Sequence, residues 1–138
     1  VKKLYEASAN GVPVKLLVRG NCSLMAGISG VSDTICINGI IDRYLEHSRI
    51  FIFAAGGEDK TFIGSADWMP RKLDNRVEVV TPVYDPLIKA DLRKVIEFGL
   101  RDNCQGSIVD GSGENRPWTT ENDVPFRSQE ELYKSYKE

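Results

Sequence analysis

Short blocks of apolar residues alternate with polar and glycine-rich segments along the chain, a pattern typical of a domain built from strands and helices. Continuous or alternating apolar runs predict five strands, at residues 14–18, 34–41, 50–53, 61–63 and 76–81. The glycine-rich turn at residues 54–60 predicts that the third and fourth strands form a hairpin.

Three other stretches have the apolar spacing of helices. The first ends at Asn10-Gly11, the second begins at the cap Asp85-Pro86 and continues to about Leu100, and a polar helix covers 128–138. Together these elements predict an α/β fold with a mixed sheet and flanking helices, in which the helix after Asp85 covers the sheet. No capping residue precedes the first helix, so we expect the chain to be a fragment of a longer one.

The segment after Gly64 predicts one short helical turn at residues 66–69, because Pro70 disfavours helix in the residue before it. We expect Trp68 to be a core residue, since large aromatic side chains are usually buried. Beyond Asp102 the chain becomes rich in glycine, serine, asparagine and threonine. We expect residues 104–138 to be a tail with a short polar helix.

Composition excludes several classes of protein. The 138 residues are 41% hydrophobic and 28% charged, the balance of one soluble globular domain. A formal charge of -2 disfavours a nucleic-acid partner, and the apolar runs are too short for a transmembrane segment. Without a signal-peptide pattern, we expect a cytoplasmic location, with membrane association left open for the full-length protein. Cys22, Cys36 and Cys104 lack metal-type spacing, which predicts reduced structural thiols.

The candidate chemistry begins at the single histidine, His47, two residues before Arg49. On a strand the two side chains would share a face, and the hairpin would return the hydroxyl and free backbone amides of Gly64-Ser65 to them. A titratable base, a cation and amide donors suit a phosphate whose charge is held while a proton moves. Taken alone, however, a single histidine is more often structural than catalytic.

Further arginines could bind phosphate. Arg19 follows the strand at 14–18, at the strand end where open parallel sheets usually bind ligands, and Gly20 would allow close approach. Arg76 and Glu78 would share one face of their strand, as an ion pair or as a phosphate arginine oriented by a carboxylate. Arg71 and Lys72 add positive charge near the Gly64-Ser65 turn, but a solvated basic loop would explain them equally well. The chain lacks a Walker loop, so any nucleotide would be held by another device.

The motifs around His47 and Gly64-Ser65 resemble those of a known family. His-x-Arg, an apolar strand, a hairpin and Gly-Ser-x-Asp are similar to the phospholipase-D signature, His-x-Lys followed by Gly-Ser-x-Asn. Three departures are Arg49 for the lysine, Ala54 where an aspartate would fall, and Asp67 for the asparagine. The polyphosphate kinase branch has five ordered blocks that match this chain at Leu4 to Ser8, Val18 to Gly20, Arg43 to Arg49, Ser65 to Arg71 and Arg76 to Val79.

The resemblance covers about the first hundred residues. It implies that residues 1–103 are the second phospholipase-D-like catalytic half of a polyphosphate kinase, which uses ATP and Mg²⁺ to extend polyphosphate reversibly through a phosphohistidine. The phosphorylated histidine and the magnesium ligands would lie in the first half, outside this chain, so we assign no metal residue and expect the fragment alone to be inactive. The partners would be polyphosphate, ATP/ADP, the first catalytic half and N-terminal regions of the same protein, and further copies in a homo-oligomer.

The resemblance also implies roles for single residues. His47 would act as acid or base or hold the transferring phosphoryl group, while Arg19 and Arg76 would neutralise phosphate charge. Arg49 and Ser65 are weaker candidates for the same pocket. Two other classes stay open: a phospholipase-D-type phosphodiesterase or nuclease that pairs two copies of one half, and a non-catalytic phosphate-binding module in which His47 is structural.

Overall fold

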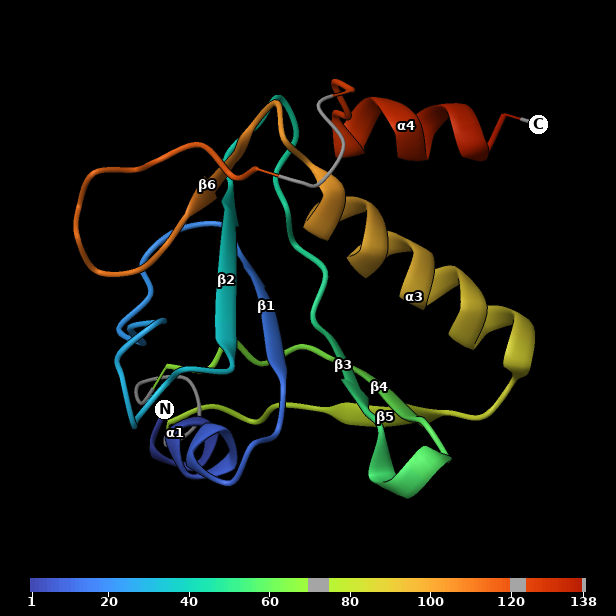
Figure 1. The fold of residues 1–138 in the computed structure, drawn as a ribbon. Helices are drawn as coiled ribbons and strands as arrows, with labels where there is room; N and C mark the ends of the chain where they lie inside the picture. Colours follow the sequence, from blue (N-terminus) through green and yellow to red (C-terminus); the bar gives the residue numbers. More distant parts are fainter. Residues whose placement is uncertain (70–74, 120–123, 138) are drawn as a thin grey trace. The chain divides into compact units, whose positions relative to one another are not determined.

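The computed structural model describes residues 1–69, 75–119 and 124–137 (Figure 1). They form two compact units, unit 1 with Val1–Glu46 and Glu97–Glu138, and unit 2 with His47–Ile96. Each unit contains a three-stranded sheet. The predicted mixed α/β class is therefore confirmed, with the strands divided between two sheets.

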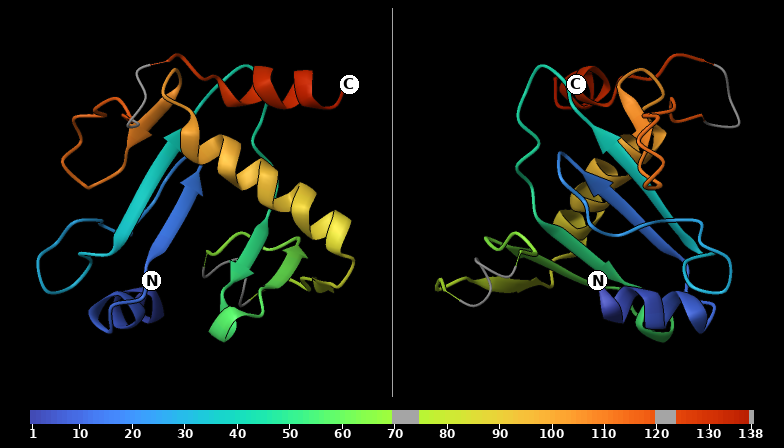
Figure 2. Two further views of the ribbon diagram at one scale, coloured as in Figure 1. Left: turned by 45° about the vertical axis from the view of Figure 1, so that its right-hand side comes forward. Right: turned by 90° about the vertical axis from the view of Figure 1, so that its left-hand side faces the viewer.

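The sheet of unit 1 has the order β1-β2-β6 and consists of β1 (Val14–Val18), β2 (Ile35–Ile40) and β6 (Gly106–Ile108). β1 and β2 are parallel, with Val14 opposite Ile35 and Val18 opposite Gly39, and their arrows point the same way in both views of Figure 2. β6 is antiparallel to β2. The carboxyl ends of β1 and β2 therefore meet at one edge, and Arg19 and Ile41 are the first residues beyond it.

The core of unit 1 forms where one face of β2 meets the first helix and the loop that follows β1. Leu24, Ile35 and Ile37 are buried together, and Leu4 and Tyr5 of α1 (Lys2–Ala9) pack against them. The Tyr5 hydroxyl also accepts a hydrogen bond from the Met25 amide at 2.9 Å. The predicted first helix and first two strands are confirmed by these elements.

The C-terminal part of unit 1 is more ordered than its composition indicated. Residues 106–108 form the edge strand β6, which the sequence did not predict, and the Trp118 indole N–H donates to the Leu100 carbonyl at 2.9 Å. The predicted polar helix is confirmed as α4 (Ser128–Ser135). Gly106 is required at its position, because a Cβ there would lie 2.1 Å from the Asp102 carbonyl oxygen.

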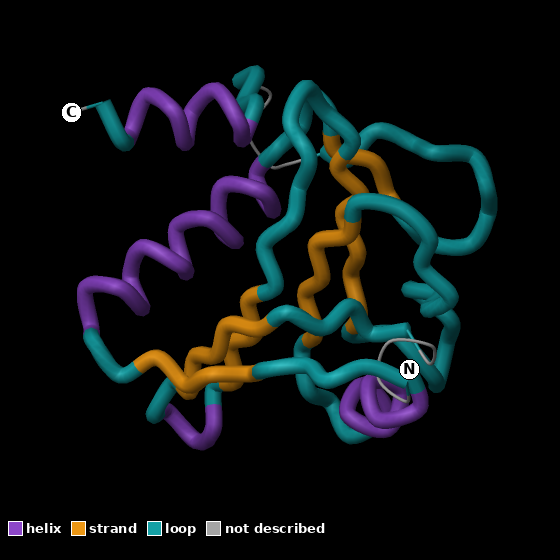
Figure 3. The backbone as a smooth tube through the Cα atoms, turned by 180° about the vertical axis from the view of Figure 1, so that it is seen from behind, coloured by secondary structure: helices purple, strands orange, loops and turns teal. Residues whose placement is uncertain are grey.

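Unit 2 contains an antiparallel sheet of β3 (Ile50–Phe53), β4 (Lys60–Gly64) and β5 (Val80–Val83), in that order. Its strands are drawn in orange in Figure 3. The 3-10 turn η1 (Ala55–Gly57) connects β3 to β4, so the predicted hairpin is confirmed. Gly56 and Gly57 have φ of 74° and 107°, a region where glycine is favoured over residues with a Cβ.

Three predictions for unit 2 are wrong. The strand predicted at residues 76–81 is shorter and later, because β5 begins at Val80 and runs through Pro82. Among the described residues β5 pairs with β4 alone, and proline is tolerated in such an edge strand. Residues 66–69 form no helical turn. Trp68 is 55% exposed and stacks on Phe51 with ring centroids 5.3 Å apart, while its small neighbour Ala66 is buried.

The helix predicted from Asp85 is confirmed as α3 (Pro86–Arg101). The Asp85 carboxylate accepts hydrogen bonds from the amides of Leu87 and Ile88 at 2.8 and 3.1 Å, as an N-cap does. Its last turn packs in unit 1, where Gly99 lies against Leu17 of β1. In the described part of the chain, no helix combines the length and apolarity needed to cross a membrane.

Candidate functional site

His47 lies directly before the hairpin of unit 2, in the loop that leads into β3, and its side chain is exposed. The Arg49 guanidinium reaches back to it. Its Nη1 lies 3.0 Å from His47 Nδ1 and donates to the His47 carbonyl oxygen at 2.8 Å. The predicted proximity of the two side chains is therefore found, although it arises from a loop contact and not from a shared strand face.

Asp67 holds Arg49 from the other side. Arg49 Nε and Nη2 lie 2.9 and 2.7 Å from Asp67 Oδ1, and the two side chains are 15% and 23% exposed. These residues are two of the three departures from the phospholipase-D signature. In the structure the two departures are partners in one ion pair.

The Gly64-Ser65 turn has no free backbone amides, which corrects our expectation. Gly64 N–H donates to the Arg49 carbonyl at 3.0 Å, and Ser65 N–H donates to the Val79 carbonyl at 3.0 Å. The Ser65 hydroxyl donates to Glu78 and accepts from the Val79 amide at 3.0 Å. The turn therefore fastens the chain after β4 to the segment before β5.

Arg76 is exposed and precedes β5. The carboxylate that we expected to orient it, Glu78, instead accepts the hydrogen bond from Ser65. Arg76 and Glu78 consequently do not share a strand face, because the strand starts after both of them. Arg71 and Lys72 lie outside the described residues.

Arg19 belongs to unit 1 and is partly buried at the carboxyl edge of the parallel strands. It lines a cavity of about 210 Å³. The other lining residues come from the end of β2 and the segment after it: Ile40, Ile41, Asp42, Tyr44, Leu45 and Glu46. The position is the one that sequence reasoning expected for a ligand-binding arginine.

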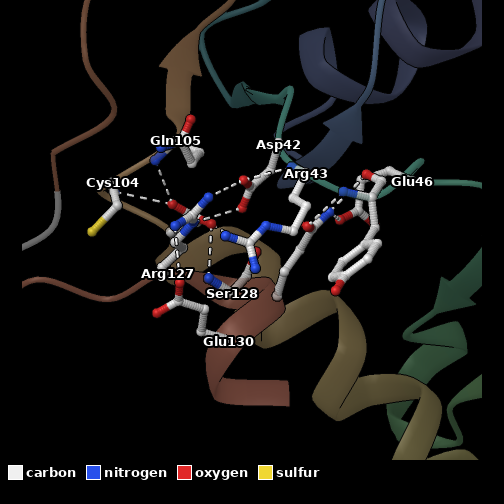
Figure 4. A network of polar contacts seen from close by, with 11 residues as sticks. Asp42, Arg43, Glu46, Cys104, Gln105, Arg127, Ser128 and Glu130 are labelled. Carbon is white, nitrogen blue, oxygen red and sulfur yellow. Dashed lines mark hydrogen bonds and ion pairs between the residues drawn. The ribbon is translucent and has the colours of Figure 1, made fainter. Parts of the chain in front are cut away.

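An ion pair attaches the C-terminal part of unit 1 to this cavity wall (Figure 4). Arg127 Nε donates to the carboxylate of Asp42 at 3.0 Å, and Nη2 of the same guanidinium contacts the second oxygen. The Asp42 side chain is only 2% exposed. The hydrogen bond from Arg127 holds the pKa of Asp42 below its ordinary value of 3.8, against the opposing effect of burial.

Gln129, at the start of α4, makes the next contacts along the same segment. Its side-chain amide donates to the Tyr44 carbonyl and to the Glu46 carboxylate, each at 2.8 Å, and its oxygen accepts from the Tyr44 amide at 3.0 Å. Glu46 is the residue before His47. We call Arg127, Gln129 and their partners the residue 42–46 clamp. No sequence signal pointed to it, because its members lie 83 to 85 residues apart.

Asp102 anchors the helix that carries the clamp. It is fully buried, and its Oδ1 accepts from the amides of Cys104 and Gln105 at 3.0 and 2.7 Å. Its Oδ2 accepts from the amide and hydroxyl of Ser128 at 2.8 and 2.7 Å (Figure 4). One carboxylate thus joins the end of α3 to the start of α4.

Comparison with known proteins decides the family. The family described as "Polyphosphate kinase C-terminal domain 2" matches residues 1–129. The chain belongs to the polyphosphate kinase family. The match extends beyond the first hundred residues that the motifs cover, so the residue 42–46 clamp lies within the family domain.

The relatives agree with this assignment. The polyphosphate kinase of Escherichia coli K12 is 44% identical over 133 residues, which are 96% of this chain and 19% of that protein. The polyphosphate kinase of Rhodopirellula baltica is 45% identical over 134 residues, 96% of this chain and 16% of that protein. The crystal structure of polyphosphate kinase from Porphyromonas gingivalis superimposes with a TM-score of 0.91 at 40% identity, over 98% of this chain and 21% of that one. The chain therefore spans about a fifth of the length of these polyphosphate kinases.

Proposed function

We propose that this polyphosphate kinase C-terminal domain is the second catalytic half of a phospholipase-D-like enzyme that reversibly transfers the terminal phosphate of ATP to polyphosphate. Residues 1–103 would carry that half and residues 104–138 its tail. The observation that carries the proposal is the family match over residues 1–129, together with a histidine held by a fixed guanidinium at the mouth of a hairpin.

We assign the central role to His47, as acid or base or as the group that holds the transferring phosphoryl. It is exposed, and Arg49 restrains both its ring and its backbone. Arg19 and Arg76 neutralise phosphate charge, in a reaction that depends on positioning and electrostatics. Arg49 and Ser65, both in unit 2, are weaker candidates for contact with the same phosphate.

The charges around Arg19 bear on its ability to bind an anion. Its cavity also contains the carboxylates of Asp42 and Glu46, which would repel a phosphate. Arg127 neutralises Asp42, and Gln129 donates to Glu46. The clamp therefore reduces the negative potential beside Arg19 as well as fixing the segment.

We propose that ATP and Mg²⁺ act in the full-length enzyme. As the family resemblance implies, we place the Mg²⁺ contacts in the first catalytic half, outside this chain. The proposed partners are the first catalytic half and N-terminal regions of the same protein, polyphosphate, ATP, and further copies in a cytoplasmic homo-oligomer.

The test uses the full-length polyphosphate kinase that contains this chain. With His47→Gln, we expect ATP-dependent polyphosphate synthesis to fall by about 10²- to 10⁴-fold, the usual contribution of a positioned acid or base. Ser48→Ala, at an exposed neighbouring position, is the matched control and should retain activity. Undiminished synthesis by His47→Gln, or appreciable synthesis by the 138-residue chain alone, would overturn the proposal.

A further inference from the structure

We infer that Arg49 and Asp67 are positioning residues that hold His47 in the tautomer with its proton on Nε2. The inference deepens the proposed function, on which it rests for the statement that His47 faces the reacting phosphate. It also gives Arg49 a role other than the phosphate contact for which its charge first suggested it.

The tautomer follows from which groups can donate. A guanidinium has only N–H donors, so at the 3.0 Å contact Arg49 Nη1 donates and His47 Nδ1 accepts. An accepting Nδ1 carries no proton. The neutral imidazole then has its proton on Nε2, and a doubly protonated ring would lose this hydrogen bond.

The same nitrogen also fixes the orientation of the ring. Arg49 Nη1 donates to the His47 carbonyl at 2.8 Å while it contacts Nδ1 of the same residue. One guanidinium therefore holds both the backbone and the ring of His47. Rotation of the imidazole by a half-turn would remove Nδ1 from the donor and place a carbon against it.

Asp67 makes this arrangement rigid. Nε and Nη2 of Arg49 both face Asp67 Oδ1, at 2.9 and 2.7 Å, so all three guanidinium nitrogens face protein atoms. The pair is mostly shielded from solvent, at 15% and 23% exposure. An arginine whose charge is balanced in this way is better suited to orient a neighbour than to bind a substrate phosphate.

The two departures from the phospholipase-D signature consequently belong together. A lysine at position 49 would have one nitrogen, which could not contact Asp67 with two nitrogens and His47 with a third. An asparagine at position 67 would lack the charge that holds the guanidinium. The structure therefore explains Arg49 and Asp67 as one joint substitution.

The tautomer restricts what His47 can do. With its proton on Nε2, the exposed ring nitrogen has no lone pair in the ring plane and donates a hydrogen bond instead. In phosphoryl transfer, such a donor stabilises the charge on a phosphate oxygen. Neutral imidazoles serve as electrophilic donors in other enzymes. To act as a nucleophile through this exposed nitrogen, His47 would need the opposite tautomer, with a lone pair on Nε2.

The single histidine makes the tautomer directly measurable. In the 138-residue chain with ¹⁵N-labelled histidine, every ring-nitrogen signal belongs to His47. At a pH where the ring is neutral, we expect one protonated Nε2 signal and one unprotonated Nδ1 signal. Arg49→Met and Asp67→Asn should give a mixture of both tautomers, while the control Arg43→Met should resemble wild type. A wild-type ring protonated on Nδ1, or unchanged tautomers in Arg49→Met, would overturn the inference.

Two further measurements keep the test decisive. If the backbone spectrum shows that the chain alone is unfolded, the same labelling is applied to the full-length enzyme, where the His47 signals are those lost in His47→Gln. In that enzyme, Arg49→Met should lower kcat about tenfold or more with little change in KM for polyphosphate, whereas a phosphate ligand would raise KM. A KM effect alone would contradict the positioning role. The spectroscopic result does not depend on activity, so failure of this inference is distinguishable from failure of the proposed function.

Discussion

Replacement of Asp102 by asparagine, which keeps the shape of the side chain, should strongly destabilise the fold. The carboxylate is fully buried and accepts four hydrogen bonds, two on each oxygen, from Cys104, Gln105 and Ser128. Asparagine has the same shape but one oxygen only. Whichever way its amide is placed, an NH₂ group faces donors.

The expected loss of stability follows from the orientation of the asparagine amide that costs the least free energy. If the remaining oxygen faces Cys104 and Gln105, the Ser128 hydroxyl can turn to accept from the new NH₂, but the Ser128 backbone N–H is left unpaired. An unpaired buried donor costs about 1 to 3 kcal/mol, and each of the two retained bonds loses about 1 kcal/mol when its acceptor becomes neutral. Together these changes give about 3 to 5 kcal/mol, a large part of a typical domain stability of roughly 5 to 15 kcal/mol.

Urea unfolding measures this loss, and hydrogen exchange locates it. The amide of Ser128 should lose protection in Asp102→Asn, since it loses its acceptor. Asp91→Asn, which weakens a half-exposed ion pair to Lys94 on α3, is the control and should cost no more than about 0.5 kcal/mol. A loss below about 1 kcal/mol for Asp102→Asn would refute the argument that this carboxylate anchors α4.

Further predictions concern pH and glycine positions. Because Arg127 lowers the pKa of Asp42, their pair stabilises the fold above the unfolded value of 3.8, and this contribution is lost as pH falls through the lower folded pKa. In urea unfolding, Arg127→Met should therefore be less stable than wild type at about pH 6, and the difference in stability should shrink as the pH falls below 3.8. A difference in stability that does not depend on pH would contradict this. Gly106→Ala should destabilise by about 3 kcal/mol or more in thermal unfolding, because its Cβ would lie 2.1 Å from a backbone oxygen. Gly20→Ala, with nothing within 4 Å of its Cβ, should change stability little, and equal effects would refute the packing argument.

Elements with a local cause were predictable from the sequence. The cap at Asp85 and the glycine turn between β3 and β4 each depend on residues a few positions apart, and both are found. The position of Arg19 directly after the strand at residues 14–18 was also predictable, and the structure adds that β1 is parallel to β2 there. These features rest on backbone preferences that a short window of sequence contains.

Features set by distant partners were not predictable. The alternation of polar and apolar residues at 76–81 indicated a strand. In the structure the Ser65 hydroxyl makes hydrogen bonds to Glu78 and Val79, which join the segment before β5 to the turn after β4. The sequence indicated Arg49 as a cation beside His47, but it did not indicate that Asp67, 18 residues later, pairs with it. The clamp to residues 42–46 and the strand β6 depend on residues in a segment whose composition indicated only a tail.

The central claim is that Arg19 and Arg76 bind phosphate, and titration with polyphosphate at fixed salt tests it most directly. The proteins are the wild-type 138-residue chain, Arg19→Ala, Arg76→Ala and the control Arg116→Ala, whose charge is paired with Asp110. We predict that wild type and control bind alike and that the other two lose about 1.5 to 3 kcal/mol each, the contribution of a hydrogen bond to a charged group. Equal binding by all four proteins would contradict the account.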